Sequence, residues 1–242
     1  MRIFAIVWGC ALAVAARAAE PPVAAQAVVA DTDRMHARDY DRRTRLARTH
    51  PNELWRLYGG DAAAKGQWRD ALRHFRRAAR HADKYSQHRI SLMYWHGVGV
   101  GRDRALAYAW ADLAAERLYP GFVVLREKMW LELGRDERER ALREGGALYA
   151  EFGDAAAKPR LQRAILKARS RTTGSRTGYT DGRLQVSGPT GAAPGGPGDF
   201  DLSAIYADWR LDARAYWAVE DAIWKHGNVE VGPATAVDDP AD

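Results

Sequence analysis

The chain has 242 residues, of which 47% are apolar, so it is long enough to bury a core and too apolar to be a disordered chain. Its 37 Lys and Arg residues exceed its 31 Asp and Glu residues modestly. Nucleic acid is the usual partner of a basic, Arg-rich domain, so that possibility is weighed below.

The first 18 residues have the pattern of a secretory signal peptide. Arg2 gives a basic start, an apolar run follows from 3 to 16, and Ala16-Arg17-Ala18 resembles a small-residue cleavage site. The run is too short to span a membrane comfortably, which takes about 20 apolar residues. We therefore expect a periplasmic or secreted protein with no integral membrane segment after cleavage.

The chain has a single cysteine, Cys10, which lies inside this predicted signal peptide. Cleavage would leave no cysteine, which excludes disulfides and thiol catalysis in the mature protein. Val7-Trp8-Gly9-Cys10 loosely resembles a lipoprotein box, but Trp8 is large where a small residue is expected. The apolar run also continues beyond Cys10, so the sequence favours ordinary secretion over lipidation.

Residues 19–51 hold no clean apolar period and are expected to form a loosely ordered arm or a surface helix. Pro51-Asn52 then marks a helix start, with Asn52 as the N-cap. From 52 to 171, apolar residues return every three or four positions and glycines interrupt the pattern. This rhythm predicts an all-α domain of antiparallel helix pairs.

An internal repeat supports that prediction. Ala71-x-x-His74-Phe75-x-x-Ala78-Ala79 recurs 36 residues later as Ala107-x-x-Trp110-Ala111-x-x-Ala114-Ala115. The alanines would let neighbouring helices approach closely, and the ring would fill the space between layers. A helix-turn-helix period of this length is typical of an α/α solenoid.

Two repeat families share these patterns. Trp55, Tyr58-Gly59, Ala62, Gly66, Trp68, Ala71, Phe75 and Ala78 lie at the spacing of a tetratricopeptide repeat. Residues from about 86 to 121 resemble the Sel-1-like repeat at Met93, Tyr94, Gly97, Gly99, Val100, Asp103, Ala107, Trp110, Ala114 and Ala115. A third unit keeps the lengths, with helices at 119–133 and 138–152, but few signature residues. The resemblance implies an α/α superhelical solenoid, and proteins with such repeats act mostly as adaptors in complexes, often in the bacterial envelope.

The glycines of the Sel-1-like unit explain how its first helix ends. Gly97 and Gly99 are expected to take left-handed or close-approach backbone, which glycine adopts at little cost. Val100 is expected to be the apolar plug of the loop, and Asp103 to cap the next helix. A phosphate-binding loop is not indicated, because no Gly-Lys-Ser/Thr follows and a helix stands where a strand should precede.

The C-terminal third divides into shorter pieces. Residues 153–171 predict a helix, 172–186 a turn with a small β-hairpin from Tyr179 to Val186, and 187–200 a flexible Gly- and Pro-rich linker. Residues 201–242 predict a short helix, from about Asp212 to His226, and a tail. An isolated helix of this length is marginal in water, so it must dock. It either caps the last helix pair of its own solenoid or binds a partner.

No residue pattern indicates catalysis, a cofactor or a metal. His74, His81 and His88 are seven residues apart, about 10.5 Å along a helix, which is too far for a shared ion. No serine lies in a Gly-x-Ser-x-Gly turn, and the pair Glu220-Asp221 is adjacent rather than convergent.

The sequence therefore favours a non-catalytic adaptor or scaffold that binds a protein or peptide. Trp95, His88 and Leu92 lie on a helical stripe away from the core-facing side and are the predicted contact residues, unless Trp95 packs on the next helix. Arg73, Arg76, Arg77 and Arg80 form a cationic face that is either simply solvated or in contact with an anionic envelope surface.

Two other functions remain open at this stage. The first is an envelope hydrolase whose site the sequence does not reveal, although Sel-1-like proteins with enzymatic activity are rich in cysteine pairs and this mature chain would have none. The second is a nucleic-acid binder with a false signal peptide. Predicted export and the lack of a basic-aromatic motif argue against nucleic acid as a partner.

Overall fold

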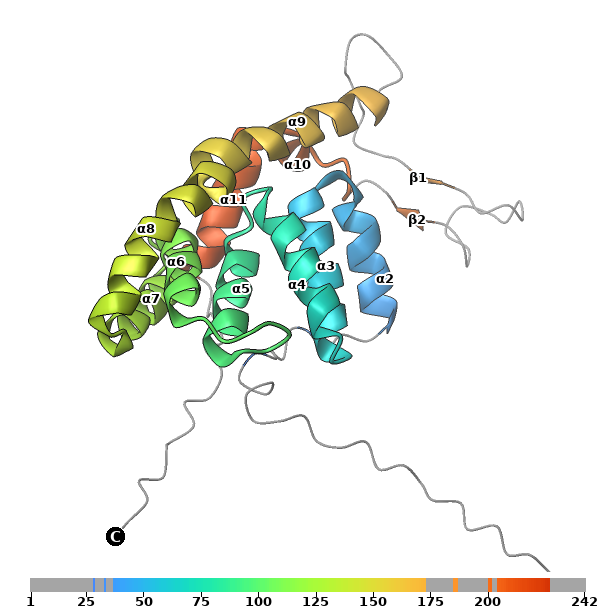
Figure 1. Cartoon of the computed structure of the whole chain (residues 1–242). Helices are drawn as coiled ribbons and strands as arrows, with labels where there is room; N and C mark the ends of the chain where they lie inside the picture. Colours follow the sequence, from blue (N-terminus) through green and yellow to red (C-terminus); the bar gives the residue numbers. More distant parts are fainter. Residues whose placement is uncertain are drawn as a thin grey trace, which may run out of the picture.

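The computed structural model describes residues 28, 33, 37–172, 185–186, 200–201 and 204–226, and within them the chain is mostly helical, with helices that pack against one another (Figure 1). The helices are, in chain order, α2 (Ala37–Leu46), η2 (Ala47–Thr49), α3 (Pro51–Ala64), α4 (Trp68–Ala79), α5 (Lys84–His96), α6 (Arg104–Ala114), η3 (Ala115–Arg117), α7 (Pro120–Glu132), α8 (Arg135–Phe152), α9 (Asp154–Thr172), α10 (Asp208–Leu211) and α11 (Ala213–His226). The predicted signal peptide and most of the predicted linker lie outside these residues. In the predicted arm, 37–49 is helical and His50 is extended.

Helices α3 with α4 and α5 with α6 form two closely packed hairpins. The alanines of the internal repeat are buried in both, including Ala71 and Ala107 at 0% exposure. Close approach is extreme at Gly59 of α3, where a Cβ atom would lie 2.5 Å from the ring of Phe75 in α4. The repeated small residues therefore act as the sequence predicted, by letting helix backbones come together.

The loop between α5 and α6 contains both predicted left-handed glycines, Gly97 with φ 69° and Gly99 with φ 73°. The prediction that Val100 plugs this loop is wrong. Val98 is the residue that joins the core, at 6% exposure, while Val100 is half-buried. Val98 lies between the two left-handed glycines, where the chain reverses direction over the ends of the hairpin.

Of the two predicted N-cap residues, Asp103 is confirmed and Asn52 is wrong. Asp103 accepts a hydrogen bond from the Leu106 backbone N–H at 2.9 Å, as predicted for the start of α6. Asn52 does not cap α3, because Pro51 already occupies the first helical turn and His50 is the N-cap residue. The Asn52 side chain is buried and donates instead to the Tyr216 hydroxyl at 2.6 Å.

The third helix pair departs from the first two. Its helices begin and end near the predicted positions, but α8 packs chiefly on α6 and not along α7. Tyr149 of α8 donates to the Asp112 carboxylate at 3.1 Å, and Arg140 pairs with Asp103, so side chains from α8 are tied to α6 at two levels. Helix α7 contacts α6 and η3.

Helix α9 runs back along the row of hairpins. It contacts α8 near its start and η2, α3 and α10 further on, so it spans one side of the molecule (Figure 1). Leu161 and Ile165 of α9 are fully buried against Tyr216 of α11. Helix α9 therefore covers the helix pairs along that side.

The two short strands, β1 (Gln185–Val186) and β2 (Phe200–Asp201), pair antiparallel with Val186 opposite Phe200. They include the end of the predicted hairpin, but its other residues, 179–184, are not described. The partner of β1 is the last residue of the predicted linker with the residue after it, and not a strand within the predicted hairpin.

Candidate interaction surfaces

The predicted contact residues do not form one exposed stripe. Trp95 is only 9% exposed and packs with Ala107 and Met129 in a core between α5, α6 and α7. His88 stacks on Phe122 of α7 at 4.9 Å, and Leu92 is partly buried against two clusters. The interpretation of this stripe as a free surface is therefore wrong: α7 covers it, which is the packing alternative named for Trp95.

The residues that resemble a Sel-1-like signature serve the packing of the helices. Met93, Ala107, Trp110, Ala114 and Ala115 are each at most 1% exposed. The half-buried residue Tyr94 packs beside them. These residues build the body on which any binding surface is displayed.

The three histidines considered as metal ligands each have a separate environment. His74 stacks on Trp55 at 5.4 Å, and His88 stacks on Phe122. Burial, with Arg160 and Arg80 nearby, lowers the pKa of His81 to about 4. Among the residues that the structure describes, no group of three or more His, Cys, Asp or Glu side chains is arranged to hold a metal ion.

A buried charge cluster joins α5 to the start of α9. Lys84 is 2% exposed and reaches Glu116 at 2.5 Å and Asp154 at 3.2 Å, and Arg117 holds Asp154 through two hydrogen bonds of 2.7 and 2.9 Å. Burial lowers the pKa of Lys84 despite these carboxylates. Burial would raise the pKa of Asp154, but the contacts and charge of Arg117 and Lys84 hold it well below its ordinary value. Every charge in the cluster faces a partner within the protein, which makes it a structural joint.

A second polar network fastens the C-terminal helices to α3. The Tyr216 hydroxyl donates to Glu53 at 2.9 Å, and Arg210 donates to the same carboxylate at 2.7 Å. The His50 Nε2 atom lies 2.9 Å from the backbone oxygen of Arg210, which fixes the proton of the neutral ring on Nε2. Burial, supported by the positive charge of Arg210, lowers the pKa of His50 to about 4.

Helix α11 extends from this network across the N-terminal ends of α3, α5 and α7. Its Trp224 ring lies 5.6 Å from Tyr85 of α5 and 5.6 Å from Phe122 of α7. Asp221 accepts from the Tyr119 hydroxyl at 2.5 Å just before α7. This face of the helix row is therefore filled by the chain itself, which is the first of the two alternatives named for this helix. The predicted place, the last helix pair, is wrong, because the partners of α11 lie at the starts of α3, α5 and α7, more than 100 residues away in the chain.

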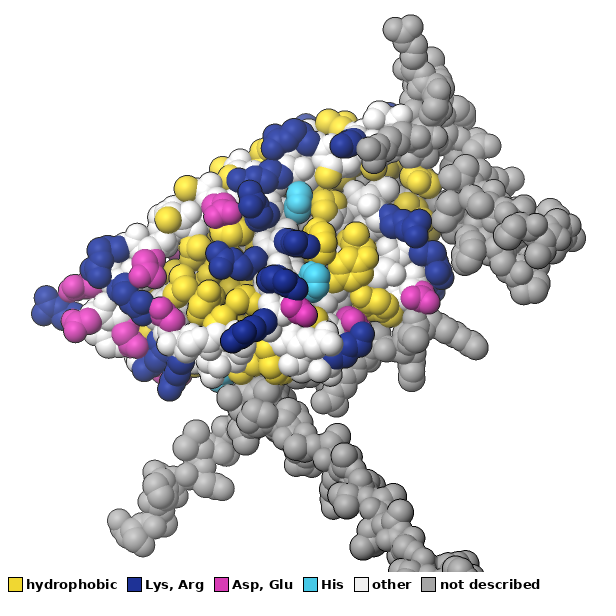
Figure 2. All heavy atoms as spheres, turned by 45° about the vertical axis from the view of Figure 1, so that its right-hand side comes forward, with side chains coloured by type: hydrophobic (Ala, Val, Ile, Leu, Met, Phe, Trp, Pro, Cys, Tyr) yellow, Lys and Arg dark blue, Asp and Glu magenta, His cyan; other side chains and the backbone are white. Residues whose placement is uncertain are grey.

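A different surface is formed by partly buried side chains of α4, α6 and α8. It consists of four apolar side chains that pack on the main core, namely Trp68, Leu72, Leu106 and Leu148. Figure 2 shows hydrophobic side chains gathered beside rows of Lys and Arg on this side of the molecule. We call these four residues the apolar strip.

One edge of the apolar strip carries a stripe of arginines. Arg69, Arg73, Arg76 and Arg80 recur at intervals of four, three and four residues, which places them on one face of α4, with Arg80 as its C-cap residue. Each is exposed, although the Arg76 guanidinium also lies 6.0 Å from the centre of the Trp110 ring. Asp70 pairs with Arg73 at 2.5 Å and Glu151 with Arg80 at 3.6 Å, which offsets part of the charge. We call these four residues the arginine stripe.

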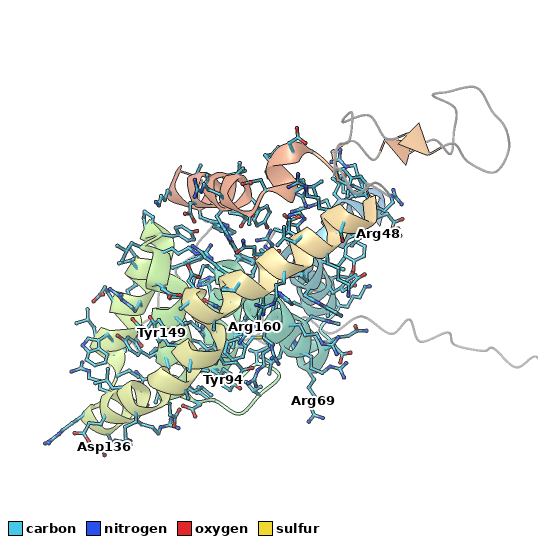
Figure 3. All side chains as sticks on the ribbon, turned by 90° about the horizontal axis from the view of Figure 1, so that it is seen from above. Arg48, Arg69, Tyr94, Asp136, Tyr149 and Arg160 are labelled. Atoms are coloured by element: carbon cyan, nitrogen blue, oxygen red, sulfur yellow. The ribbon has the colours of Figure 1, made fainter. Side chains whose placement is uncertain are left out.

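The face that α11 covers and the surface with the arginine stripe lie on opposite sides of α9. Figure 3 shows α10 and α11 on one side of that helix and Arg69 and Tyr94 on the other, with Arg69 pointing away from the body. Arg77, which the sequence placed on the predicted cationic face, is not part of the stripe, because its guanidinium lies over the Trp55 ring at 4.5 Å.

Comparison of the chain with protein-family models, curated proteins and solved structures finds no match. No helix in the described part of the chain combines the length and the apolar character that crossing a bilayer requires.

Proposed function

We propose that this chain is an exported, non-catalytic helical-repeat protein that acts as an adaptor in the bacterial envelope and binds an acidic protein segment between α4 and α8. Its Sel-1-like residues, 86–121, and its packed helix hairpins support membership of that repeat class. The single observation that carries the proposal is the arginine stripe beside the apolar strip.

The chemistry of the surface defines the partner. An apolar strip bordered by cations fits an amphipathic segment whose apolar side covers Leu72 and Leu106 and whose acidic side faces α4. The opposite border, on α8, is mixed in charge because Arg140 and Glu144 both lie there, 3.7 Å apart. Acidic residues on the α4 side of the segment would therefore determine its orientation.

An anionic membrane is a poorer fit for this surface. Insertion into a bilayer needs apolar side chains that project beyond the protein surface. The members of the apolar strip are partly buried between helices, so they do not project in that way.

Charge reversal on the arginine stripe tests the proposal. Arg69→Glu with Arg73→Glu changes two exposed side chains without touching the core, and Arg143→Glu with Arg163→Glu makes the same change of charge elsewhere. Crosslinking in envelope fractions should recover a partner with the wild type and with the control, and at least tenfold less with the stripe variant. Equal recovery with both variants, at unchanged helicity, would refute binding through this surface.

Fractionation of cells that express the tagged protein tests the location. We expect the mature chain in the periplasm or the medium, shortened by the predicted signal peptide. Full-length protein in the cytoplasm would contradict a function in the envelope.

A further inference from the structure

The contacts of α11 describe a second binding surface, independent of the arginine stripe. We propose that the N-terminal ends of α3, α5 and α7 form a site for an amphipathic helix with an aromatic and acidic face, and that α11 occupies this site as a tethered ligand that a partner helix of the same chemistry replaces.

The residues that α11 presents to this site follow one helical face. Tyr216, Trp217, Glu220, Asp221 and Trp224 are spaced i, i+1, i+4, i+5 and i+8. Ile223 lies on the other side and is 55% exposed. From its N-terminal end, this face of α11 thus carries two aromatic side chains, then two carboxylates, then a third aromatic side chain.

Each of these positions meets a matching group. Tyr216 lies between the His50 ring, whose centre is 4.5 Å away, and the side chains of Asn52 and Glu53. The Trp217 ring has the guanidinium of Arg117 at 4.3 Å. This site selects its ligand by shape at the first aromatic position and by a cation at the second.

The two carboxylates face positive groups at the helix ends. Glu220 lies 4.0 Å from Arg56, and Asp221 lies 3.8 Å from Arg117. The N-terminal ends of three helices point at this region, and their partial positive charge adds to that of the two arginines. The third aromatic side chain, Trp224, packs against Tyr85 and Phe122 at the end of the contact.

Helix α11 contributes to two smaller apolar clusters, through Tyr216 against Leu161 and Ile165 of α9 and through Trp224 against Phe122 of α7. The two largest apolar clusters among the described residues contain side chains of α3 to α8 and of Val28, and none from α10 or α11. The contact with α11 is instead rich in Tyr, Trp and Arg, which is the composition of a protein-protein interface. Residues 173–203 join α9 to α10, so α11 is held near its site by a tether, which raises its effective concentration there.

The full chain with a protease site inserted between residues 190 and 191 tests the proposal. After cleavage, a labelled synthetic peptide of residues 204–226 is added, and its binding is followed by fluorescence anisotropy. We expect the peptide to exchange with the released C-terminal piece, and to bind the uncleaved chain about a hundredfold more weakly because the tether favours the resident helix.

Peptide variants identify the surface without affecting the fold of the protein. Trp224→Ala in the peptide should weaken binding at least tenfold, because the ring lies among aromatics from two helices. Ile223→Ala, next to it on the exposed side, should leave binding within about twofold and serves as the matched control.

Two results would overturn the proposal. If the cleaved pieces stay together and the peptide never enters, α11 is a permanent part of the fold. If Trp224→Ala and Ile223→Ala bind equally well, the peptide uses another surface. Neither result bears on the arginine stripe, whose variants test the proposed function separately.

Discussion

The same substitution, glycine to alanine inside a helix, should have opposite effects at two positions of this protein. In α8, no atom lies within 4 Å of the place where a Cβ atom of Gly145 would stand. Alanine there should stabilise the protein by about 0.5–1 kcal/mol, because it restricts the unfolded chain and favours the helix. In α3, the Cβ atom of Gly59 would lie 2.5 Å from two atoms of the Phe75 ring.

The cost at Gly59 follows from how firmly that ring is held. Phe75 is 0% exposed, so it has no free space to move into. Overpacking of a core costs about 1–3 kcal/mol, and the helix gain of about 0.5–1 kcal/mol offsets only part of it. We therefore expect Gly59→Ala to lower the free energy of unfolding by about 1–2 kcal/mol, or the melting temperature by about 2–8 °C.

Urea denaturation followed by far-UV circular dichroism measures both variants against the wild type. Phe75→Leu supplies the control, because a smaller side chain makes room for the new methyl group. Its cost should be lower in the Gly59→Ala background than alone, by about 1 kcal/mol. If Gly59→Ala stabilises the protein as much as Gly145→Ala does, then α3 and α4 are not packed as closely as described.

Three further predictions concern buried groups. Trp95→Ala should lower the free energy of unfolding by about 3–5 kcal/mol in chemical denaturation, because the ring lies in a core and its removal leaves a cavity. A decrease below about 1 kcal/mol would contradict the position of Trp95 in that core. His50 has its pKa lowered to about 4 by burial, so stability should fall by up to about 3 kcal/mol as pH drops from 6.5 to 4, where the unfolded chain binds the proton first. Glu220, whose pKa burial raises, acts in the opposite direction, so the contribution is read as the difference from His50→Gln, which should be the less pH-dependent protein. Asp154→Asn should cost about 3–5 kcal/mol, since it removes a carboxylate from the buried ammonium of Lys84, and an unchanged urea midpoint would contradict the joint between α5 and α9.

Local signals were enough for much of the fold. The left-handed glycines 97 and 99, the cap at Asp103 and the limits of α11 each depend on a few neighbouring residues, and each was predicted correctly. Asn52 shows where a local signal misleads. A cap residue next to Pro51 is plausible by sequence, but Tyr216, 164 residues away, decides its role.

The candidate surfaces depended more on long-range packing. Trp95 has the position of a groove residue within α5 alone, and Met129 of α7 covers it. The placement of α7 and α8 could not be predicted, because they do not repeat the hairpin of the earlier units. The arginine stripe was visible in part, since the intervals between arginines on α4 already define a face; its apolar neighbour Leu106 comes from a different helix.

The most direct test of the proposed function is a photo-crosslinking residue placed at single positions of the full chain in cells. At Leu72, within the apolar strip, we expect an adduct with one protein, which Arg69→Glu with Arg73→Glu abolishes. At Leu142, which is 67% exposed on the outer side of α8, we expect no such adduct. The same adduct at both positions, or one at Leu72 that survives the charge reversal, would contradict recognition of an acidic partner between α4 and α8.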